Sequence, residues 1–296
     1  TGIYNLYITS TSPIAILGKK PNFVTSPLVI IYPTSSPASN STSASSSSQS
    51  TSNSGGSNNT TNTTISNNQI TEVVNKLINF IKSKQDTTGK ILDGGTSDWV
   101  AMTFAANNIY PQDIKNGDKS LYDYIYNYST SDLDSELNNC AAYPRHLLAL
   151  LSAGVPTTDS KIVELKNKID TACVKNNKFG QDGINDDVFG LLALLALGEN
   201  VNSSSTQIIT NTILSDQKPD GSFTWNGYSG ADITGAVINA LKYGKNKGLD
   251  IDDKIFEGAK KYLKNQQLAD GGWGFGSSDA LTTSWAVMGI NALSES

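Results

Sequence analysis

Several segments of this chain are apolar on almost every face when they are read as helices. They are LLALLSAG, FGLLALLALG, GAVINALKYG and WAVMGINAL. A helix of that kind has to be buried on all sides. Between them lie amphipathic segments such as TEVVNKLINFIKSK and IFEGAKKYLKNQ, in which one face is polar. No alternating strand pattern intervenes, so residues 67–296 are predicted to form an all-α domain of alternating buried and half-buried helices.

The apolar helices recur at a nearly constant interval along the chain. Their aligned starts are Asp98, Tyr143, Asp187, Asp232 and Thr282. Successive starts are separated by 45, 44, 45 and 50 residues. A period of this length predicts a repeat architecture of about five helical hairpins, each with one buried and one half-buried helix.

A shared turn motif follows three of the amphipathic helices: Gln, three residues, Gly, one residue, then a large apolar side chain. Its copies begin with Gln85 and Gly89, Gln217 and Gly221, and Gln267 and Gly271, the last reading QLADGGWGF with Trp273 as the apolar residue. We expect the glutamine amide to donate to unpaired carbonyls at the end of its own helix. The glycine would stop that helix in a left-handed conformation, and the apolar side chain would cover the next hairpin. These positions are therefore interpreted as structural.

This motif resembles the QW-type repeat of squalene-hopene and oxidosqualene cyclases. Their α/α-toroid fold also occurs in the β subunits of protein prenyltransferases, in complement thioester domains and in cobalamin carriers. The resemblance covers residues 67–296 and implies a barrel of inner helices wrapped by outer helices. Six hairpins complete a ring in that fold, whereas this chain has about five, so whether the ring closes is left open.

The chemistry of these relatives is matched only in part. The cyclase DxDD acid aligns with Ile184-Asn185-Asp186-Asp187, which leaves Asp186 and Asp187 as weak catalytic candidates. Neither cysteine follows an Asp at the spacing of the prenyltransferase zinc ligands, and His146 is interpreted as a core histidine. The thioester sequence Cys-Gly-Glu-Gln is absent. The inner-helix aromatic residues that could line a carbocation-stabilising cavity are Trp99, Phe104, Phe189 and Trp285.

The resemblance also implies that the first residues of the inner helices meet at one mouth. Asp98, Tyr143, Asp187, Asp232 and Thr282 would there form a polar ring around an apolar cavity, or simply cap their helices. Loops at the same mouth carry Trp225, Tyr228, Trp273 and Phe275. These aromatic side chains would either stack on a ligand or plug the repeat ends. The stretch Asp182 to Asp187 is oxygen-rich enough for calcium but lacks the spacing of a known loop. No other cofactor or metal is predicted.

The two cysteines fit the same geometry. Cys140 lies just before the second inner helix and Cys173 at the end of the third outer helix. The toroid implied by the resemblance places both at one end of adjacent repeats, so we expect a disulfide between them, with two buried thiols as the alternative. A disulfide is typical of an extracytoplasmic protein.

The first 66 residues differ in character from the repeat domain. Residues 1–33 contain GIYNLYITS and SPLVIIYP, interpreted as the end of an upstream β module, Ig-like or other, or as a β-rich tail on the main domain. Residues 34–66 are almost entirely Ser, Thr, Asn and Gly, which predicts a disordered linker of the kind that joins modules of secreted or surface proteins. The start at Thr1, without methionine or signal peptide, is typical of a fragment or a processed form.

Net charge and hydropathy limit the kinds of partner that this chain is expected to bind. The net charge is −5 with no cluster of Lys and Arg, which argues against a nucleic-acid partner. No apolar run reaches the roughly 18 residues of a membrane span. The sequence therefore predicts an extracellular or cell-surface monomer whose toroid mouth binds or displays a small molecule, glycan or protein without catalysis. Two alternatives stay open: an isoprenoid enzyme related to terpene cyclases or prenyltransferases, and a cobalamin-type carrier.

Overall fold

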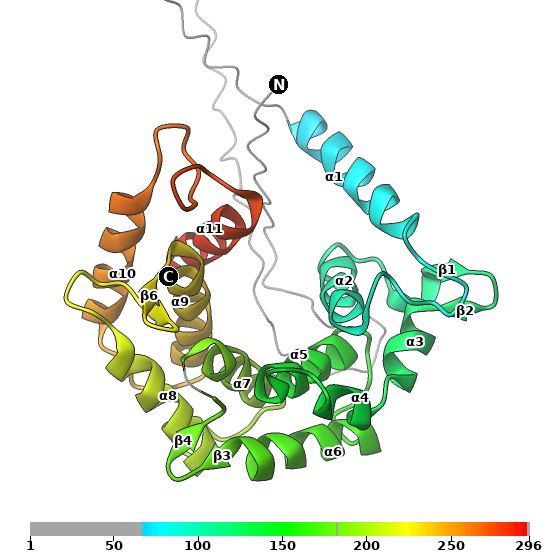
Figure 1. Ribbon diagram of the computed structural model, residues 1–296, viewed down its shortest axis with the longest axis horizontal. Coiled ribbons are helices and arrows are strands. Elements are labelled where there is room, and N and C mark those ends of the chain that lie inside the picture. Colours follow the sequence, from blue (N-terminus) through cyan, green and yellow to red (C-terminus); the bar gives the residue numbers. More distant parts are fainter. Residues whose placement is uncertain (1–66, 182, 295–296) are drawn as a thin grey trace, which may run out of the picture.

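The computed structural model describes residues 67–181 and 183–294 of the chain. The β-rich segment 1–33, the linker 34–66 and Asp182 lie outside these residues. Within them the chain is mostly helical, as the repeat pattern predicts (Figure 1). None of the described helices combines the length and the apolar character that crossing a bilayer requires.

An inner row of helices is built from the segments that are apolar on every face. Its members are α2 (Gly94–Ala106), α5 (Asn139–Ser152), α7 (Asn185–Ala196), α9 (Ala231–Asn246) and α11 (Ala280–Ser294). Each packs against the next one along the chain. Figure 1 shows the row curving around a common centre, with α2 and α11 at its two ends.

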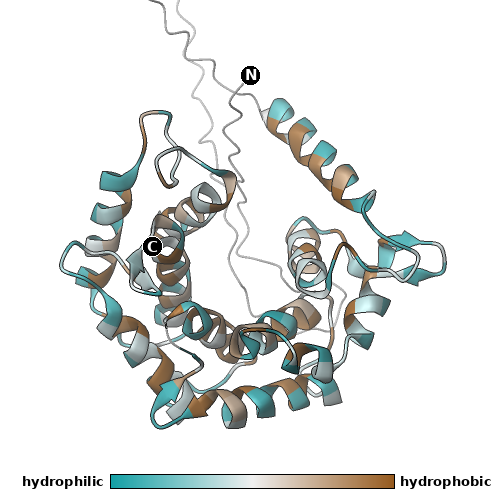
Figure 2. Ribbon diagram, viewed as in Figure 1, coloured by the Kyte–Doolittle hydropathy of each residue, from teal (hydrophilic) through white to brown (hydrophobic). Residues whose placement is uncertain are grey.

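The amphipathic segments form the outer helices. They are α1 (Asn67–Lys82), α3 (Leu121–Asn127), α4 (Thr130–Asp134), α6 (Ser160–Lys168), α8 (Ser204–Asp216) and α10 (Asp253–Gln266). Helix α3 contacts the inner helices α2 and α5, and helix α10 contacts α9 and α11. Figure 2 shows their hydrophilic faces turned outward, as expected of helices with one wet side.

The loops carry small elements that the sequence did not indicate. A 3-10 turn spans Pro111–Asp113, and a π-helical turn spans Ile169–Cys173. Two-residue antiparallel strands pair as β1 (Lys115–Asn116) with β2 (Lys119–Ser120), β3 (Val174–Lys175) with β4 (Lys178–Phe179), and β5 (Thr224–Trp225) with β6 (Tyr228–Ser229). Residues with positive φ, such as Asn226 and Gly227, make these tight turns possible.

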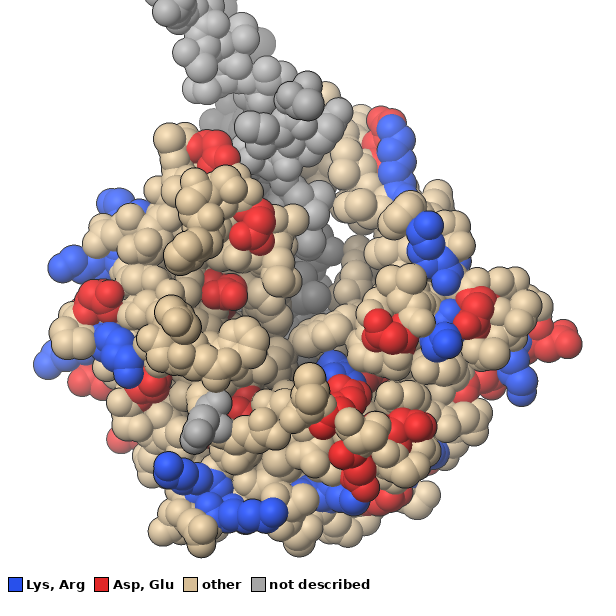
Figure 3. Space-filling model, in the orientation of Figure 1, with Lys and Arg blue, Asp and Glu red and all other residues tan. Residues whose placement is uncertain are grey.

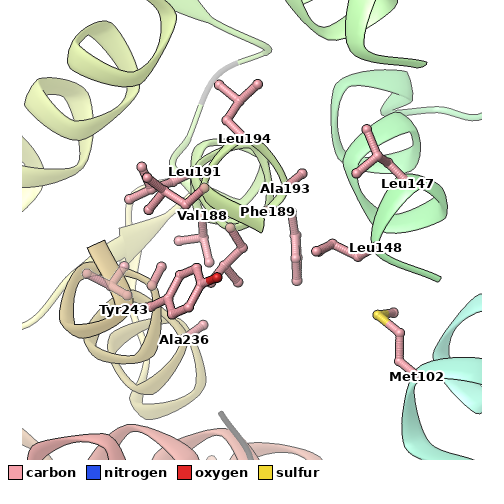
Figure 4. Packing of buried hydrophobic residues seen from close by; sticks show 14 of the residues in the cluster. Met102, Leu147, Leu148, Val188, Phe189, Leu191, Ala193, Leu194, Ala236 and Tyr243 are labelled. Carbon is pink, nitrogen blue, oxygen red and sulfur yellow. The ribbon is translucent and has the colours of Figure 1, made fainter. Parts of the chain in front are cut away.

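The hydrophobic core lies between the inner and outer helices. Leu147, Leu191 and Leu194 are fully buried there. Figure 4 shows Leu194 on one side of α7, whereas Met102 and Leu148 point from α2 and α5 toward the space that the inner helices enclose. The inner helices therefore present apolar side chains both to the outer layer and to the centre, which explains why no face of them is polar.

Helices α9 and α11 approach so closely at Gly235 and Gly289 that a side chain at either position would clash. A Cβ atom placed on Gly235 would lie 2.2 Å from the main-chain oxygen of Trp285, and one on Gly289 would lie 2.7 Å from the Cα atom of Gly235. Both glycines are buried in the contact. The absence of side chains at these two positions brings the last inner helix against its neighbour.

The Gln–Gly turns join neighbouring outer segments, although not through the bonds predicted. Gln217 donates from Nε2 to the carbonyl of Gly221 (3.3 Å) and to that of Ile255 in the first turn of α10 (2.8 Å). The expectation that the amide would bind the last carbonyls of its own helix is wrong. The glycine has φ of +91°, which confirms the left-handed turn.

The other two copies of the motif differ in an informative way. Gln85 donates to the carbonyls of Gly89 and Ile114, both at 3.0 Å, and so also reaches the segment before the next outer helix. Gln267 donates only to the carbonyl of Gly271 (2.8 Å). The structure describes no further outer helix after α10 to which it could donate.

A hydroxyl group of the following inner helix holds the apolar residue of each motif. The bonds run from the backbone N–H of Ile91 to Ser97 Oγ (3.0 Å), of Phe223 to Thr234 Oγ1 (3.1 Å) and of Trp273 to Thr283 Oγ1 (2.9 Å). These hydroxyls could not be predicted from the motif, because they follow the apolar residue at unequal intervals of 6, 11 and 10 residues.

The predicted disulfide is confirmed. Cys140 and Cys173 are bonded, with Cα atoms 5.5 Å apart. Cys140 is the second residue of α5, and Cys173 ends the π-helical turn that continues α6. The bond therefore ties the start of an inner helix to the end of the next outer segment, at one end of the domain.

Candidate functional site

A cavity of about 630 Å³ lies at the centre of the inner row. All five inner helices contribute to its wall. The apolar part of the wall includes Trp99, Met102, Leu148, Phe189, Leu192, Trp225, Ile233, Ala236, Trp285 and Met288. The polar part consists of Thr103, Arg145, Asn185, Asp232, Asn239 and Ser284. A mainly apolar wall with a few polar groups is the usual composition of a small-molecule site.

Three aromatic rings from different inner helices meet in this cavity. The ring centroids of Trp99 and Phe189 are 5.4 Å apart, and Trp285 lies 6.1 Å from each of them. All three pairs are edge-to-face, an arrangement that adds to the stability gained from burial. Because Trp99 and Trp285 come from the two ends of the inner row, their contact spans the interval between α2 and α11.

The aromatic expectation is therefore confirmed for three of its four residues. Trp99, Phe189 and Trp285 line the cavity. Phe104 does not; its side chain is fully buried among the core residues.

Two polar residues of α9 stand in the wall without a protein partner. Asp232 lies in the first turn of the helix, and Asn239, which is 4% exposed, lies two turns further on. No hydrogen bond or ion pair joins either side chain to another side chain in the described ranges. Asn239 is buried, and burying an unpaired polar group is costly. Asp232 is half-buried in the same wall. These two residues are the natural contacts for a ligand.

Arg145 is the one cationic side chain that the described wall contains, and its nitrogens are engaged. Nε donates to Asp98 Oδ2 at 3.0 Å, and the two terminal nitrogens donate to Glu136 at 2.9 and 2.7 Å. The two acidic groups hold the pKa of Arg145 above its usual range despite burial. Arg145 is thus fixed as a structural cation with more acidic than basic charge around it.

Asp98 does not form part of a mouth. Its side chain is fully buried, and Oδ1 lies 2.8 Å from Nδ1 of His146, so the histidine has a partner in the core as predicted. The N-cap of α2 is instead Asp93, whose Oδ1 accepts a hydrogen bond from the backbone of Thr96. The predicted capping or ring position for Asp98 is therefore wrong, because the helix begins earlier than the apolar pattern.

Of the nine residues predicted at the mouth, the structure brings Asp232 and Trp225 to the cavity. Trp225, in β5, is 49% exposed and is separated from the helix that carries Asp232 only by the short strand β6 and its turns. This short separation along the chain places an aromatic face and a carboxylate in the same wall.

Two of the other predicted mouth residues are buried in structural positions. Tyr143 is 2% exposed and donates its hydroxyl to Asp134. Trp273 is 4% exposed and donates from Nε1 to the carbonyl of Leu263 at 2.7 Å, near the end of α10. Trp273 therefore plugs the end of a repeat, which was the structural alternative for the loop aromatics.

Three more lie outside the cavity wall. Tyr228 and Phe275 are exposed on the surface. Thr282 is half-buried, and its backbone N–H donates to the side chain of Asp279 at 2.8 Å. None of the three contributes to the site.

The two cyclase-acid candidates also face away from the cavity. Asn185, Phe189 and Leu192 form the face of α7 that lines it, whereas Asp186 and Asp187 are 1% exposed on other faces. Burial raises the pKa of Asp186 to about 6. Burial, and then the neighbouring charge of Asp186, raises the pKa of Asp187 to about 8.

Asp187 has an unusual environment for a carboxyl group. Neither of its oxygens has a hydrogen-bond partner in the described structure. Asp186, by contrast, accepts a bond from the backbone N–H of Gln181 at 2.7 Å. An unpaired carboxyl group in the interior is held in its neutral form, because the charged form would lose its hydration without compensation.

The structure offers no support for the calcium hypothesis. The described residues contain no group of three or more His, Cys, Asp or Glu side chains that could hold a metal ion. Asp182, the first residue of the oxygen-rich stretch, lies outside the part of the chain that the structure describes.

No protein-family model matches this chain, and no curated protein matches it either. The resemblance to QW-type repeats therefore depends on the motif, the period and the order of inner and outer helices.

Proposed function

We propose that this chain is an extracellular or cell-surface binding protein whose α/α-toroid domain holds a small organic ligand in its central cavity. Inner helices that curve around a centre, with outer helices packed on them, are the arrangement that the toroid resemblance implies. The two ends of the inner row, α2 and α11, form the open side of this ring.

The aromatic cluster of Trp99, Phe189 and Trp285 carries this proposal. These side chains form an apolar surface inside the cavity. The volume of the cavity falls within the roughly 300–1,000 Å³ typical of ligand pockets. The unpartnered side chains of Asp232 and Asn239 supply the few polar contacts that orient a ligand in such a site.

The disulfide supports the proposed location. Bonds such as Cys140–Cys173 form and persist in oxidising compartments and are rare in the cytosol.

A binding role without catalysis fits the wall better than isoprenoid chemistry. A cyclase needs a proton donor that faces the substrate. The two carboxyl groups with raised pKa, Asp186 and Asp187, lie outside the wall. The apolar aromatic surface is shared with the isoprenoid alternative. The carboxyl group of the described wall, Asp232, has no partner side chain that would hold a proton on it.

Tryptophan fluorescence provides a direct test, because three of the four tryptophans line the cavity. The neutral apolar dye N-phenyl-1-naphthylamine should bind saturably and quench the protein's emission. Trp285→Leu should weaken dye binding about tenfold, the loss expected when a stacking contact is removed. Trp273→Phe, outside the cavity, should leave the affinity unchanged.

Equal dye affinity in the native protein and in Trp285→Leu would contradict the proposed cavity site. Circular dichroism of both variants is the control for folding. Such a result would favour the exposed aromatic side chains of Tyr228 and Phe275 as the binding surface, with glycans or proteins as ligands.

A further inference from the structure

We propose that the ligand of the central cavity is an organic cation, an ammonium or similar group attached to an apolar body. The inference rests on the proposed binding function and adds to it the charge of the ligand. It follows from the balance of charges in the wall and from the kind of aromatic surface that faces them.

The charged groups at the cavity do not cancel. Each of the three nitrogens of Arg145 already donates to Asp98 or Glu136, so this cation is engaged by acidic groups of the protein. Asp232 stands in the same wall with no cationic side chain paired to it in the described residues. A ligand that enters this cavity therefore meets an excess of negative charge.

Asp232 lies in the first turn of α9, at the end of the helix where the backbone N–H groups attract negative charge. None of the ion pairs in the described residues involves Asp232. Figure 3 shows Lys and Arg mostly along the outer edge of this face, with Asp and Glu also nearer the centre. The cavity thus attracts positive ligands and repels negative ones.

The aromatic residues complement the carboxylate. A cation is attracted to the face of an aromatic ring, most strongly to tryptophan, when it lies within about 6 Å of the ring centre. Trp99, Trp225 and Trp285 all line the cavity, and Trp99 is still 39% exposed. Aromatic side chains around a cation are the means by which proteins bind quaternary ammonium ligands, and this cavity adds a carboxylate to the same wall.

The same wall is poorly suited to an inorganic cation. A divalent ion requires several oxygen ligands, commonly six or more for calcium. The described residues contain no acidic cluster of that kind, and most of the wall is apolar. The apolar surface instead requires a ligand with a hydrophobic body, and Asn185 and Asn239 offer carbonyl oxygens to any N–H group on it.

A pair of probes with equal shape and different charge tests the inference. Phenyltrimethylammonium and tert-butylbenzene differ in one central atom, nitrogen or carbon, and hence in charge. Each would be used to displace N-phenyl-1-naphthylamine from the full chain. The cation should bind at least about tenfold more tightly than its neutral counterpart.

Two variants identify the source of the preference. Asp232→Asn should weaken binding of the cation about tenfold and leave the neutral probe within about twofold. Asp118→Asn removes the same charge from an exposed turn outside the cavity and should change neither affinity.

The possible results separate the two proposals. Equal affinities of the two probes, unaffected by Asp232→Asn, would overturn the cation inference while leaving the cavity as a binding site. Failure of the cation to displace a bound dye would do the same. Failure of the dye itself to bind would overturn the proposed function, and the inference about charge with it.

Discussion

Gln217 donates its side-chain amide to the main-chain carbonyl of Ile255, 38 residues later in the chain, over a distance of 2.8 Å. The bond joins the end of α8 to the first turn of α10, so it connects two successive outer helices. The turn itself fits closely, because a Cβ atom on Gly221 would lie 2.1 Å from the carbonyl oxygen of Gly258 in α10. The motif that stops one helix is therefore also the joint between two repeats.

Loss of this joint should be measurable. We expect Gln217→Ala to lower the free energy of unfolding by about 1–3 kcal/mol, because two partly buried carbonyls lose their donor. Gln267→Ala is the matched control: Gln267 is exposed and donates to one carbonyl only, so its loss should cost under about 1 kcal/mol. Urea denaturation followed by circular dichroism compares the two. Equal losses would contradict a role in joining repeats.

The buried carboxyl groups of α7 predict an unusual pH dependence. In the unfolded chain, Asp186 and Asp187 lose their protons near pH 4. In the folded protein burial raises their pKa to about 6 and about 8. Because the folded state binds more protons between these values, the free energy of unfolding should fall as pH rises from about 4 to about 8. Each group contributes at most about 1.4 kcal/mol per pH unit.

Asp187→Asn isolates the upper part of this window. Between pH about 6 and about 8 the native protein should lose stability mainly through Asp187, whereas the variant should show little change there. Urea denaturation at a series of pH values measures both. A native protein whose stability stays level from pH 6 to 8 would show that Asp187 is already ionised at pH 6.

The disulfide should contribute strongly to stability. It closes a loop across a sequence separation of 33 residues, for which the chain-entropy treatment predicts about 3–4 kcal/mol. We expect a reducing agent to lower the midpoint of urea unfolding in the native protein. It should have no effect on the Cys140→Ala/Cys173→Ala double variant, whose midpoint should equal that of the reduced protein.

The contact between α9 and α11 should be intolerant of any side chain. Gly235→Ala would place a methyl group 2.2 Å from the main-chain oxygen of Trp285 and must push α11 away. We expect a loss of about 1–3 kcal/mol, the usual cost of overpacking, together with a change in tryptophan emission as Trp285 leaves the aromatic cluster.

Gly95→Ala is the control for that experiment. Gly95 is also helical, but a methyl group there would meet only the side chain of Arg145 at 3.4 Å, an ordinary contact distance. It should be neutral or slightly stabilising, because alanine favours the helix. If Gly235→Ala is tolerated as well as Gly95→Ala, then α9 and α11 can separate without cost.

The sequence was most informative where the repeat imposes the same requirement several times. The left-handed glycines followed from the turn motif. The joining of Cys140 to Cys173 followed from the toroid resemblance, and the plugging role of Trp273 was one of two alternatives for that residue. The partner of each glutamine could not be predicted in the same way. Ile114 and Ile255 accept through their main-chain carbonyls, which every residue type has, so their identity gives no sign of the bond.

The candidate site was only partly predictable for a related reason. An amphipathic helix reveals its buried face, but an inner helix is apolar all round, so nothing in α7 shows that Phe189 faces the cavity while Asp187 faces the core. The alignment on Asp98 and Asp187 selected residues beside the wall. The large aromatic residues Trp99 and Trp285 were the better guide, because both line the cavity, although Phe104, selected in the same way, lies in the core.

The sequence by itself determined the helical class, the alternation of apolar and amphipathic helices along the chain and the pair of cysteines. These depend on local patterns of polarity and on spacings along one chain. The tertiary structure decided which face of each inner helix meets the cavity, that Arg145 is shared by two acidic groups, and that Asp232 is left without a counterion. Those properties depend on contacts between residues far apart in the sequence, and only the packing of the helices brings them together.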